Sequence, residues 1–204
     1  MRWAALACAI GLASRGDCYV PRGTVCLDSS FESDTQDWRT TIEASQYTQW
    51  KRGEGETPTS FTGPSEAKDQ SYYWYVETNP WQNGGRPYPD SWSSLPDDAT
   101  NLESPMVSGA SDVSFYYHMY GATMGELRVT NAAGEVAWSL SGDQGDSWQA
   151  TTVDIHSPSF AFEYTRSSVH EGWGEGDAAV ALVGVSCGAG PPSPPSPPPS
   201  PPEV

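Results

Sequence analysis

The chain has 204 residues, and its 26 acidic and 10 basic side chains give a net charge of −16. That charge repels nucleic acids and anionic membranes, which leaves cations, basic proteins and neutral glycans as partners. Charged residues make up only 18% of the chain, aromatic residues make up 12%, and no helical periodicity is sustained. This composition favours short strands joined by turns over helices.

Residues 1–16 are predicted to be a secretory signal peptide. Arg2 precedes an apolar run that begins at Trp3, and small residues offer a cleavage site near Ala13 to Gly16. The run is too short to cross a bilayer, and no other stretch reaches the roughly 18 apolar residues that a crossing needs. We therefore expect an extracellular protein, secreted or associated with the cell surface, with no transmembrane segment in this chain.

Removal of the signal peptide, which contains Cys8, leaves three cysteines in the mature chain. In an oxidising compartment two of them should pair. Cys26 and Cys187 bracket the β-rich region, and the first and last strands of a closed sandwich are often neighbours, so a Cys26–Cys187 disulfide is the favoured pairing. A Cys18–Cys26 disulfide is the alternative, in which Cys187 is free or bonded to another chain.

The segment Ser71–Glu77 is a predicted strand with aromatic residues on both faces. Tyr73 and Tyr75 lie on one face, and Trp74 and Val76 lie on the other. We therefore expect burial on both sides, or one face in the core and the other under a loop.

The longest irregular segment runs from Thr78 to Asn101. Loops of this length are uncommon unless they are functional or disordered, and disordered segments usually lack aromatic residues. This loop carries Trp81, Tyr88 and Trp92, whose flat side chains could stack on sugars. Alternatively, they fold back to cover a sheet edge.

Three runs at residues 113–120, 126–130 and 136–140 alternate apolar and polar side chains. We interpret them as an antiparallel meander with one apolar face, which needs a second layer to bury it. Other strands are predicted at 102–106, 152–155, 160–165 and 178–185, the last of them leading to Cys187, with about nine to eleven strands in total. This pattern predicts an all-β fold, a two-sheet antiparallel β-sandwich, over residues 17–190.

Residues 191–204 form a Pro/Ser-rich tail that contains half of the 18 prolines of the chain. Such a composition favours an extended polyproline II linker or stalk. The Ser-Pro repeats resemble the hydroxyproline-rich segments of plant and green-algal extracellular glycoproteins.

A set of short motifs occurs in a fixed order along the predicted sandwich. They are Phe31-Glu32, Trp38, Thr62-Gly63-Pro64-Ser65, Tyr75-Val76-Glu77, Ser104-Pro105, Phe115 to Gly121, Met124 to Val129, Trp138, Gly142 to Gly145 with Trp148, Phe162-Glu163 and Gly176-Asp177. The ordered set resembles a MAM domain, the extracellular module of meprins, neuropilins and receptor-type tyrosine phosphatases, over roughly Cys26 to Cys187. The resemblance implies a jelly-roll sandwich that acts in adhesion and oligomerisation outside the cell.

The cysteines depart from the pattern of that family, in which the first usually pairs with the second and the third with the fourth. Cys26 resembles the first and Cys187 the fourth. Gln36 stands at the position of the second, and no cysteine occurs around Val113, the region of the third. Neither usual bridge can form, which supports the Cys26–Cys187 pairing.

Some members of the family bind calcium through carboxylates in three regions. Glu32 and Asp69 match two of them, whereas Ala181 and Leu182 replace the acidic pair of the third. Calcium is therefore the only cofactor that the resemblance raises, with Glu32 and Asp69 as its candidate ligands.

Catalytic motifs are missing from the sequence. His170-Glu171-Gly172-Trp173 lacks the second histidine of a zinc-protease motif, and no Gly-x-Ser-x-Gly elbow occurs. We predict a non-enzymatic extracellular adhesion module that contacts another extracellular protein or a similar MAM domain. The alternatives are a carbohydrate-binding module that uses Trp81, Tyr88 and Trp92, and an accessory domain of a longer secreted enzyme.

Overall fold

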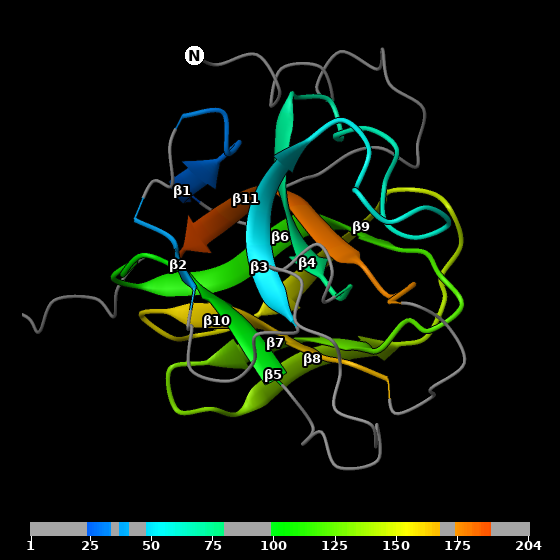
Figure 1. The fold of residues 1–204 in the computed structure, drawn as a ribbon. Helices are drawn as coiled ribbons and strands as arrows, with labels where there is room; N and C mark the ends of the chain where they lie inside the picture. The colour runs from blue at the N-terminus through cyan, green and yellow to red at the C-terminus, as the bar shows by residue number, and fades with distance from the viewer. Residues whose placement is uncertain (1–23, 34–36, 41–47, 80–98, 168–173, 189–204) are drawn as a thin grey trace, which may run out of the picture.

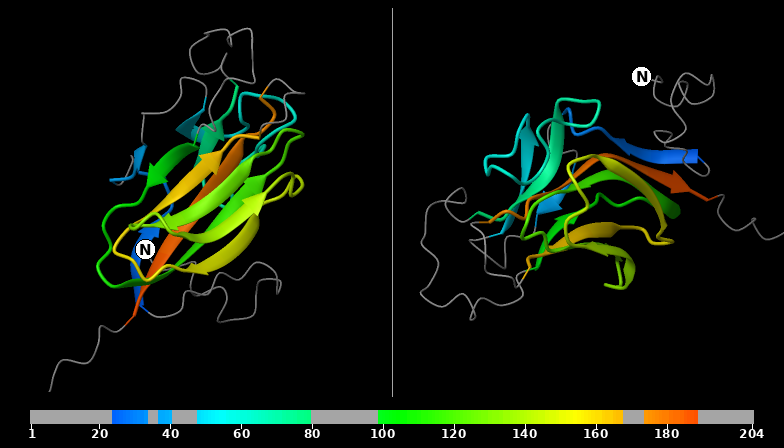
Figure 2. Two further views of the ribbon diagram at one scale, coloured as in Figure 1. Left: turned by 90° about the horizontal axis from the view of Figure 1, so that it is seen from below. Right: turned by 90° about the vertical axis from the view of Figure 1, so that its right-hand side faces the viewer.

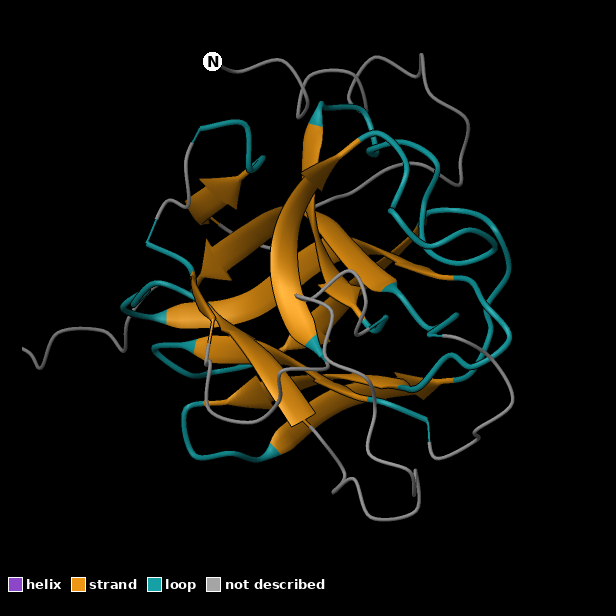
Figure 3. Cartoon of the chain, viewed as in Figure 1, coloured by secondary structure: helices purple, strands orange, loops and turns teal. Residues whose placement is uncertain are grey.

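A computed structural model describes residues 24–33, 37–40, 48–79, 99–167 and 174–188. In these residues the regular structure consists entirely of β-strands (Figure 3). The strands are β1 (Thr24–Ser29), β2 (Arg39–Thr40), β3 (Gln49–Glu54), β4 (Tyr72–Glu77), β5 (Ala99–Glu103), β6 (Ala110–Met119), β7 (Glu126–Asn131), β8 (Val136–Ser141), β9 (Gln149–Asp154), β10 (Phe160–Thr165) and β11 (Ala178–Cys187). No helix in the described part of the chain has the length and apolar character needed to span a membrane.

The strands form two antiparallel sheets that pack face to face (Figures 1 and 2). The first sheet has the order β3-β4-β11-β6-β9, and β1 also pairs with β11. The second sheet has the order β2-β5-β10-β7-β8. The predicted all-β, two-sheet jelly-roll sandwich is therefore confirmed.

The core lies between the two sheets and is rich in aromatic rings. Phe115 of the first sheet and Phe162 of the second meet edge to face, with ring centroids 4.8 Å apart. Trp38 meets Phe162 in a stacked arrangement at 6.0 Å and meets Phe31 edge-on at 5.5 Å. All four rings are buried, and each such side chain contributes about 1.5–3 kcal/mol by leaving water.

The predicted meander is wrong in one respect, because its first strand lies in a different sheet from the other two. β6 belongs to the first sheet, whereas β7 and β8 are neighbours in the second. Residues 120–125 cross between the sheets, and a Cβ atom at Gly121 or Gly125 would collide with the backbone of Glu175 or Thr165. Alternation shows which side chains face the core, but both sheets face the same core. The pattern therefore does not identify the neighbouring strand.

The short strand predicted at 102–106 is shifted in the structure to Ala99–Glu103. Pro105 has no amide hydrogen to donate and therefore cannot continue a ladder. Beyond the strand, backbone hydrogen bonds still run from Ser104 N to Phe160 O at 2.9 Å and from Val107 N to Pro158 O at 2.7 Å.

The first sheet is covered on its outer face as well. Residues 55–71 connect β3 to β4 (Figure 1) and pack over an outer cluster of Tyr73, Tyr75, Tyr116, Ala179 and Ala181. The hydroxyl of Tyr73 donates to Gly55 O at 2.7 Å, which holds this connection on the sheet. Burial of both faces of β4, as predicted, is therefore confirmed.

Candidate functional site

Several predicted features fall outside the described residues. The loop aromatics Trp81, Tyr88 and Trp92 lie in 80–98, and the signal peptide and the Pro/Ser-rich tail lie in 1–23 and 189–204. Their roles stay predictions.

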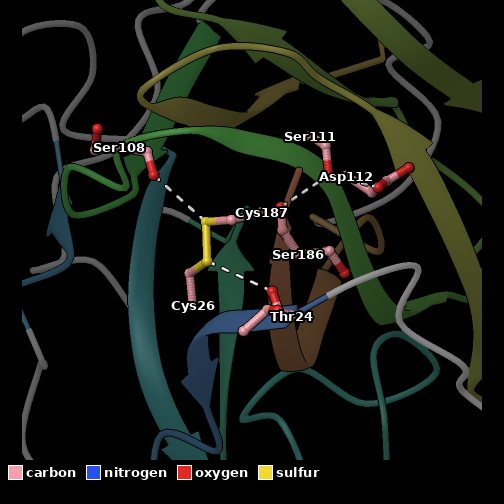
Figure 4. Close-up of a disulfide and its surroundings, with 7 residues drawn as sticks. All are labelled: Thr24, Cys26, Ser108, Ser111, Asp112, Ser186 and Cys187. Atoms are coloured by element: carbon pink, nitrogen blue, oxygen red, sulfur yellow. Dashed lines mark hydrogen bonds between the residues drawn. A yellow bond between two sulfur atoms is a disulfide. The ribbon is translucent and has the colours of Figure 1, made fainter. Parts of the chain in front are cut away.

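A disulfide joins Cys26 to Cys187, with Cα atoms 5.9 Å apart and 161 residues of separation (Figure 4). Cys26 lies where the register between β1 and β11 shifts, and Cys187 is the last residue of β11. The carbonyl oxygens of Thr24 and Ser108 lie 3.5 and 3.4 Å from the two sulfur atoms. The bond fastens the edge strand β1 to the final strand, in the pairing that the sequence favoured.

Two fully buried carboxyl groups, Glu77 and Asp177, lie at one end of the outer face of the first sheet. Asp177 Oδ1 accepts hydrogen bonds from the amide and the hydroxyl of Thr78, both at 2.9 Å. Glu77 Oε1 accepts from the Asn79 amide at 2.9 Å and the Thr59 hydroxyl at 3.4 Å. Asp177 Oδ2 has no hydrogen-bond partner among the described residues.

Burial raises the pKa of both carboxyl groups. The pKa of Asp177 lies well above its usual range because of burial first and the negative charge of Glu77 second. The pKa of Glu77 is raised by burial, against the opposing hydrogen bond from Asn79 and the charge of Lys51. The two carboxyl groups are shielded from solvent, so they fix the strand ends and are not presented to a ligand.

Sequence reasoning missed this pair, although a signal was present. Glu77 continues the alternation of Tyr73 and Tyr75, and Asp177 precedes Ala179 with the same period. Both therefore belong to the outer face, whose covering by residues 55–71 explains their burial.

His118 is another buried polar residue on this outer face, with 2% of its surface exposed. Its Nε2 lies 3.3 Å from the Asp146 carboxylate, and its ring contacts Trp148 at 5.4 Å between centroids. Burial lowers the pKa of His118 against the opposing charge and hydrogen bond of Asp146. The imidazole is thus favoured in its neutral form, packed beside an indole whose Nε1 donates to Glu66 O at 2.9 Å.

The two candidate calcium ligands are not arranged as a metal site. Glu32 Oε1 accepts hydrogen bonds from the amides of Ser71 and Tyr72 at 2.8 and 2.9 Å. The Asp69 side chain is 65% exposed and lies 3.6 Å from Lys68 Nζ. Among the described residues, no group of three or more His, Cys, Asp or Glu side chains could hold a metal ion. These donors do not fit calcium, which takes about six to eight oxygen ligands.

Phe61 is the most unusual exposed residue of the connection between β3 and β4. It is 75% exposed and has a φ of 66°, a left-handed conformation that bulky residues rarely adopt. Its surroundings are pinned, because the Thr57 hydroxyl donates to Thr62 O at 2.7 Å and the Thr62 hydroxyl donates to Tyr120 O at 2.8 Å. The amide of Gly63 also donates to Tyr120 O, at 3.0 Å. The ring of Phe61 therefore projects from a loop that is fixed to the sheet.

Comparisons with known proteins connect this architecture to one family. Residues 29–188 match the family model described as MAM domain, meprin/A5/mu. MAM domain-containing protein 2 of Mus musculus is 30% identical over 148 residues, which are 68% of this chain and 20% of that protein. MAM domain-containing glycosylphosphatidylinositol anchor protein 1 of Homo sapiens is 29% identical over 187 residues, 87% of this chain and 18% of that protein. The chain thus spans about a fifth of the length of these relatives.

Among solved structures, a cleaved adhesin domain of Lys-gingipain from Porphyromonas gingivalis is similar with a TM-score of 0.50. Its sequence is 13% identical, and the match covers 82% of this chain and 100% of that domain. At this identity the likeness shows the sandwich fold alone. The family match covers most of the chain and nearly all of the two described sheets, so the chain belongs to the MAM domain family.

Proposed function

We propose that this chain is a non-enzymatic extracellular adhesion module that binds a protein partner through the loop that carries Phe61. The observation that carries the proposal is a phenylalanine that is 75% exposed in a loop held by hydrogen bonds on both sides. Family membership supports an extracellular interaction role, and one relative is named as a glycosylphosphatidylinositol anchor protein.

An exposed aromatic side chain on a fixed loop suits the centre of a protein interface. Interfaces are enriched in aromatic residues, and a few such anchors carry most of the binding energy. Since the bonds of Thr57 and Thr62 already fix the loop that holds Phe61, little conformational entropy remains to be lost on binding. The partner should offer an apolar pocket for the ring.

The charge around the loop indicates the surroundings of that pocket. Glu54, Glu56 and Glu66 are exposed on the same segment of chain, and the whole chain carries a net charge of −16. Opposite charge on the partner would speed association and favour the correct orientation. We therefore expect basic residues around the pocket, and binding that weakens as salt screens these charges.

The test compares two variants on an array of purified extracellular proteins. Phe61→Asn removes the ring but keeps the backbone, because asparagine tolerates positive φ. Met106→Asn is the matched control, since Met106 is equally exposed, at 75%, near the opposite end of β6. Phe61→Asn should weaken binding to the proteins that the native domain captures by at least about tenfold. Met106→Asn should bind them as the native domain does.

Two results would contradict this assignment in different ways. Equal binding by Phe61→Asn and the native domain would move the interface away from this loop and leave the adhesion role standing. Binding to a parallel glycan array, lost in the Trp81→Ala, Trp92→Ala double variant, would replace protein adhesion with carbohydrate recognition.

A further inference from the structure

Three segments that are distant in sequence meet on one edge of β11. β4 pairs with the first part of β11, up to Val180, and β1 pairs with its last part, from Val183 onward. Leu182 lies between the two pairings and packs against the outer cluster. Glu32 follows β1 and accepts the amide of Tyr72 at the start of β4, so the ends of these two strands also adjoin. We call this meeting point the β1–β4–β11 junction.

The backbone at this junction is unusually strained. Phe31, Asp69 and Leu182 have φ values of 64°, 57° and 50°, and they are three of the six non-glycine residues with positive φ in the described chain. Phe31 lies two residues after β1, Asp69 lies three residues before β4, and Leu182 lies within β11. Left-handed residues of this kind are energetically unfavourable and persist where the surrounding structure enforces them, often at ligand sites.

A cationic side chain from a fourth segment binds at the junction. Arg52 of β3 donates from Nε to Phe31 O at 2.8 Å and from Nη2 to Glu32 O at 3.0 Å. Its Cζ atom lies 3.5 Å from the centroid of the Tyr72 ring. Two successive carbonyl oxygens thus point at one positive charge that also lies over an aromatic face. Carbonyl oxygens are among the ligands that a hard cation such as calcium takes in proteins.

We propose that the guanidinium of Arg52 takes the place of a bound metal cation at the β1–β4–β11 junction. The positive charge that orders the Phe31–Glu32 turn then comes from a side chain of the protein and not from a bound ion. Arginine suits this role because its charge is permanent and its planar fork can donate to two acceptors at once. Few carboxylates are offered to a metal here, since the side chain of Leu182 has no oxygen, Asp69 is exposed beside Lys68, and Glu32 Oε1 already accepts two backbone amides. Folding of this domain is accordingly independent of calcium.

Thermal unfolding of the full chain tests whether its folding is independent of calcium. The melting temperature should be the same in millimolar calcium chloride, in magnesium chloride and in a chelator. A rise in calcium alone would overturn the proposal.

Variants of Arg52 test whether its guanidinium supplies the positive charge that orders the junction. Arg52→Ala should lower the melting temperature by about 4–8 °C, because two charge-assisted hydrogen bonds and one cation–π contact are lost. Arg39→Ala, an equal change of charge at an exposed position of β2, should leave it nearly unchanged. If Arg52→Ala does not fold, Arg52→Lys serves instead, and its melting temperature should fall by less. An unchanged melting temperature in the Arg52 variant would overturn the proposal.

An arginine that replaces a metal ion differs from an ordinary structural arginine in one testable way. Once Arg52 is removed and a carboxylate is supplied, the junction should bind a metal ion. Leu182→Asp adds a carboxylate at a left-handed position that aspartate tolerates better than leucine. Calcium should raise the melting temperature of the Arg52→Ala, Leu182→Asp double variant but not that of Leu182→Asp alone, where the guanidinium still occupies the position. Absence of a calcium response in the double variant would overturn the substitution.

Discussion

Replacement of Cys26 and Cys187 by serine should lower the melting temperature of the domain by roughly 10–20 °C. The disulfide closes a separation of 161 residues, and a loop of that length restricts the unfolded chain by about 5 kcal/mol at most in the chain-entropy model. The bond also holds β1 against β11, the strand that occupies the middle of the first sheet. Its loss should therefore destabilise the whole sandwich.

Circular dichroism melts of the native and double-serine chains under non-reducing conditions measure this effect. Cys18→Ser is the control, and its melting temperature should match that of the native chain. Peptide mapping without reduction should yield a Cys26–Cys187 peptide. A Cys18–Cys26 peptide, together with a destabilised Cys18→Ser chain, would show that the alternative pairing forms.

The disulfide could be predicted because it depends on topology more than on side-chain detail. In a closed sandwich the first and last strands are adjacent, and β1 indeed pairs with β11 along residues 24–29 and 183–187. The core-facing side chains could be predicted equally well. Val113, Phe115 and Met119 recur with period two, and all three are fully buried. The first inference needs only the overall topology, and the second needs only a local pattern.

The sheet partners could not be predicted from the same pattern. β6, β7 and β8 are consecutive and alternate in the same way, but the crossing at residues 120–125 places β6 in the other sheet. That crossing depends on close packing at Gly121 and Gly125 against chain from elsewhere in the fold. Such contacts are distant in sequence and leave no local signature.

The candidate site was even harder to predict from the sequence, because its residues depart from the burial that is usual for their residue types. Glutamate and aspartate are rarely buried, whereas Glu77 and Asp177 are fully covered. Large apolar side chains tend to be buried, whereas Phe61 is 75% exposed. In each case residues 55–71 decide the outcome by covering one face of the sheet and presenting Phe61 outward. The fold of an irregular connection cannot be read from periodicity.

Asp177→Asn should make the domain more stable relative to the native chain at neutral pH than in acid, because burial disfavours the charged form of the Asp177 carboxyl group. Asp177 is fully buried, and its Oδ2 has no hydrogen-bond partner among the described residues. Burial and the neighbouring charge of Glu77 raise its pKa well above the usual range. Ionisation in the folded state therefore leaves a buried, poorly compensated charge. Asparagine retains an oxygen for the Thr78 amide and removes that charge.

The pH dependence follows from the direction of this shift. A carboxyl group whose pKa is higher in the folded than in the unfolded chain binds its proton more tightly when folded. Its stabilising contribution is complete below the unfolded pKa, about 3.9, and is lost as the pH rises through the folded pKa. The stability of Asp177→Asn relative to the native chain should accordingly rise with pH across that window. The lowered pKa of His118 acts in the opposite direction, but it is common to both chains and cancels in the comparison.

Urea unfolding of both chains from about pH 4 to about pH 8 measures the difference directly. Asp28→Asn is the matched control, since it removes an exposed carboxylate from β1, and its stability should stay within about 0.5 kcal/mol of the native chain. Glu77→Gln should behave like Asp177→Asn, because burial raises the pKa of Glu77 too. If the stability of Asp177→Asn relative to the native chain instead fell as the pH rises, Asp177 would be ionised in the folded chain and held by the charge of Lys51. The buried carboxyl groups would then form an ion-paired network that stabilises this end of the sandwich, and burial would not be the dominant influence on their protonation.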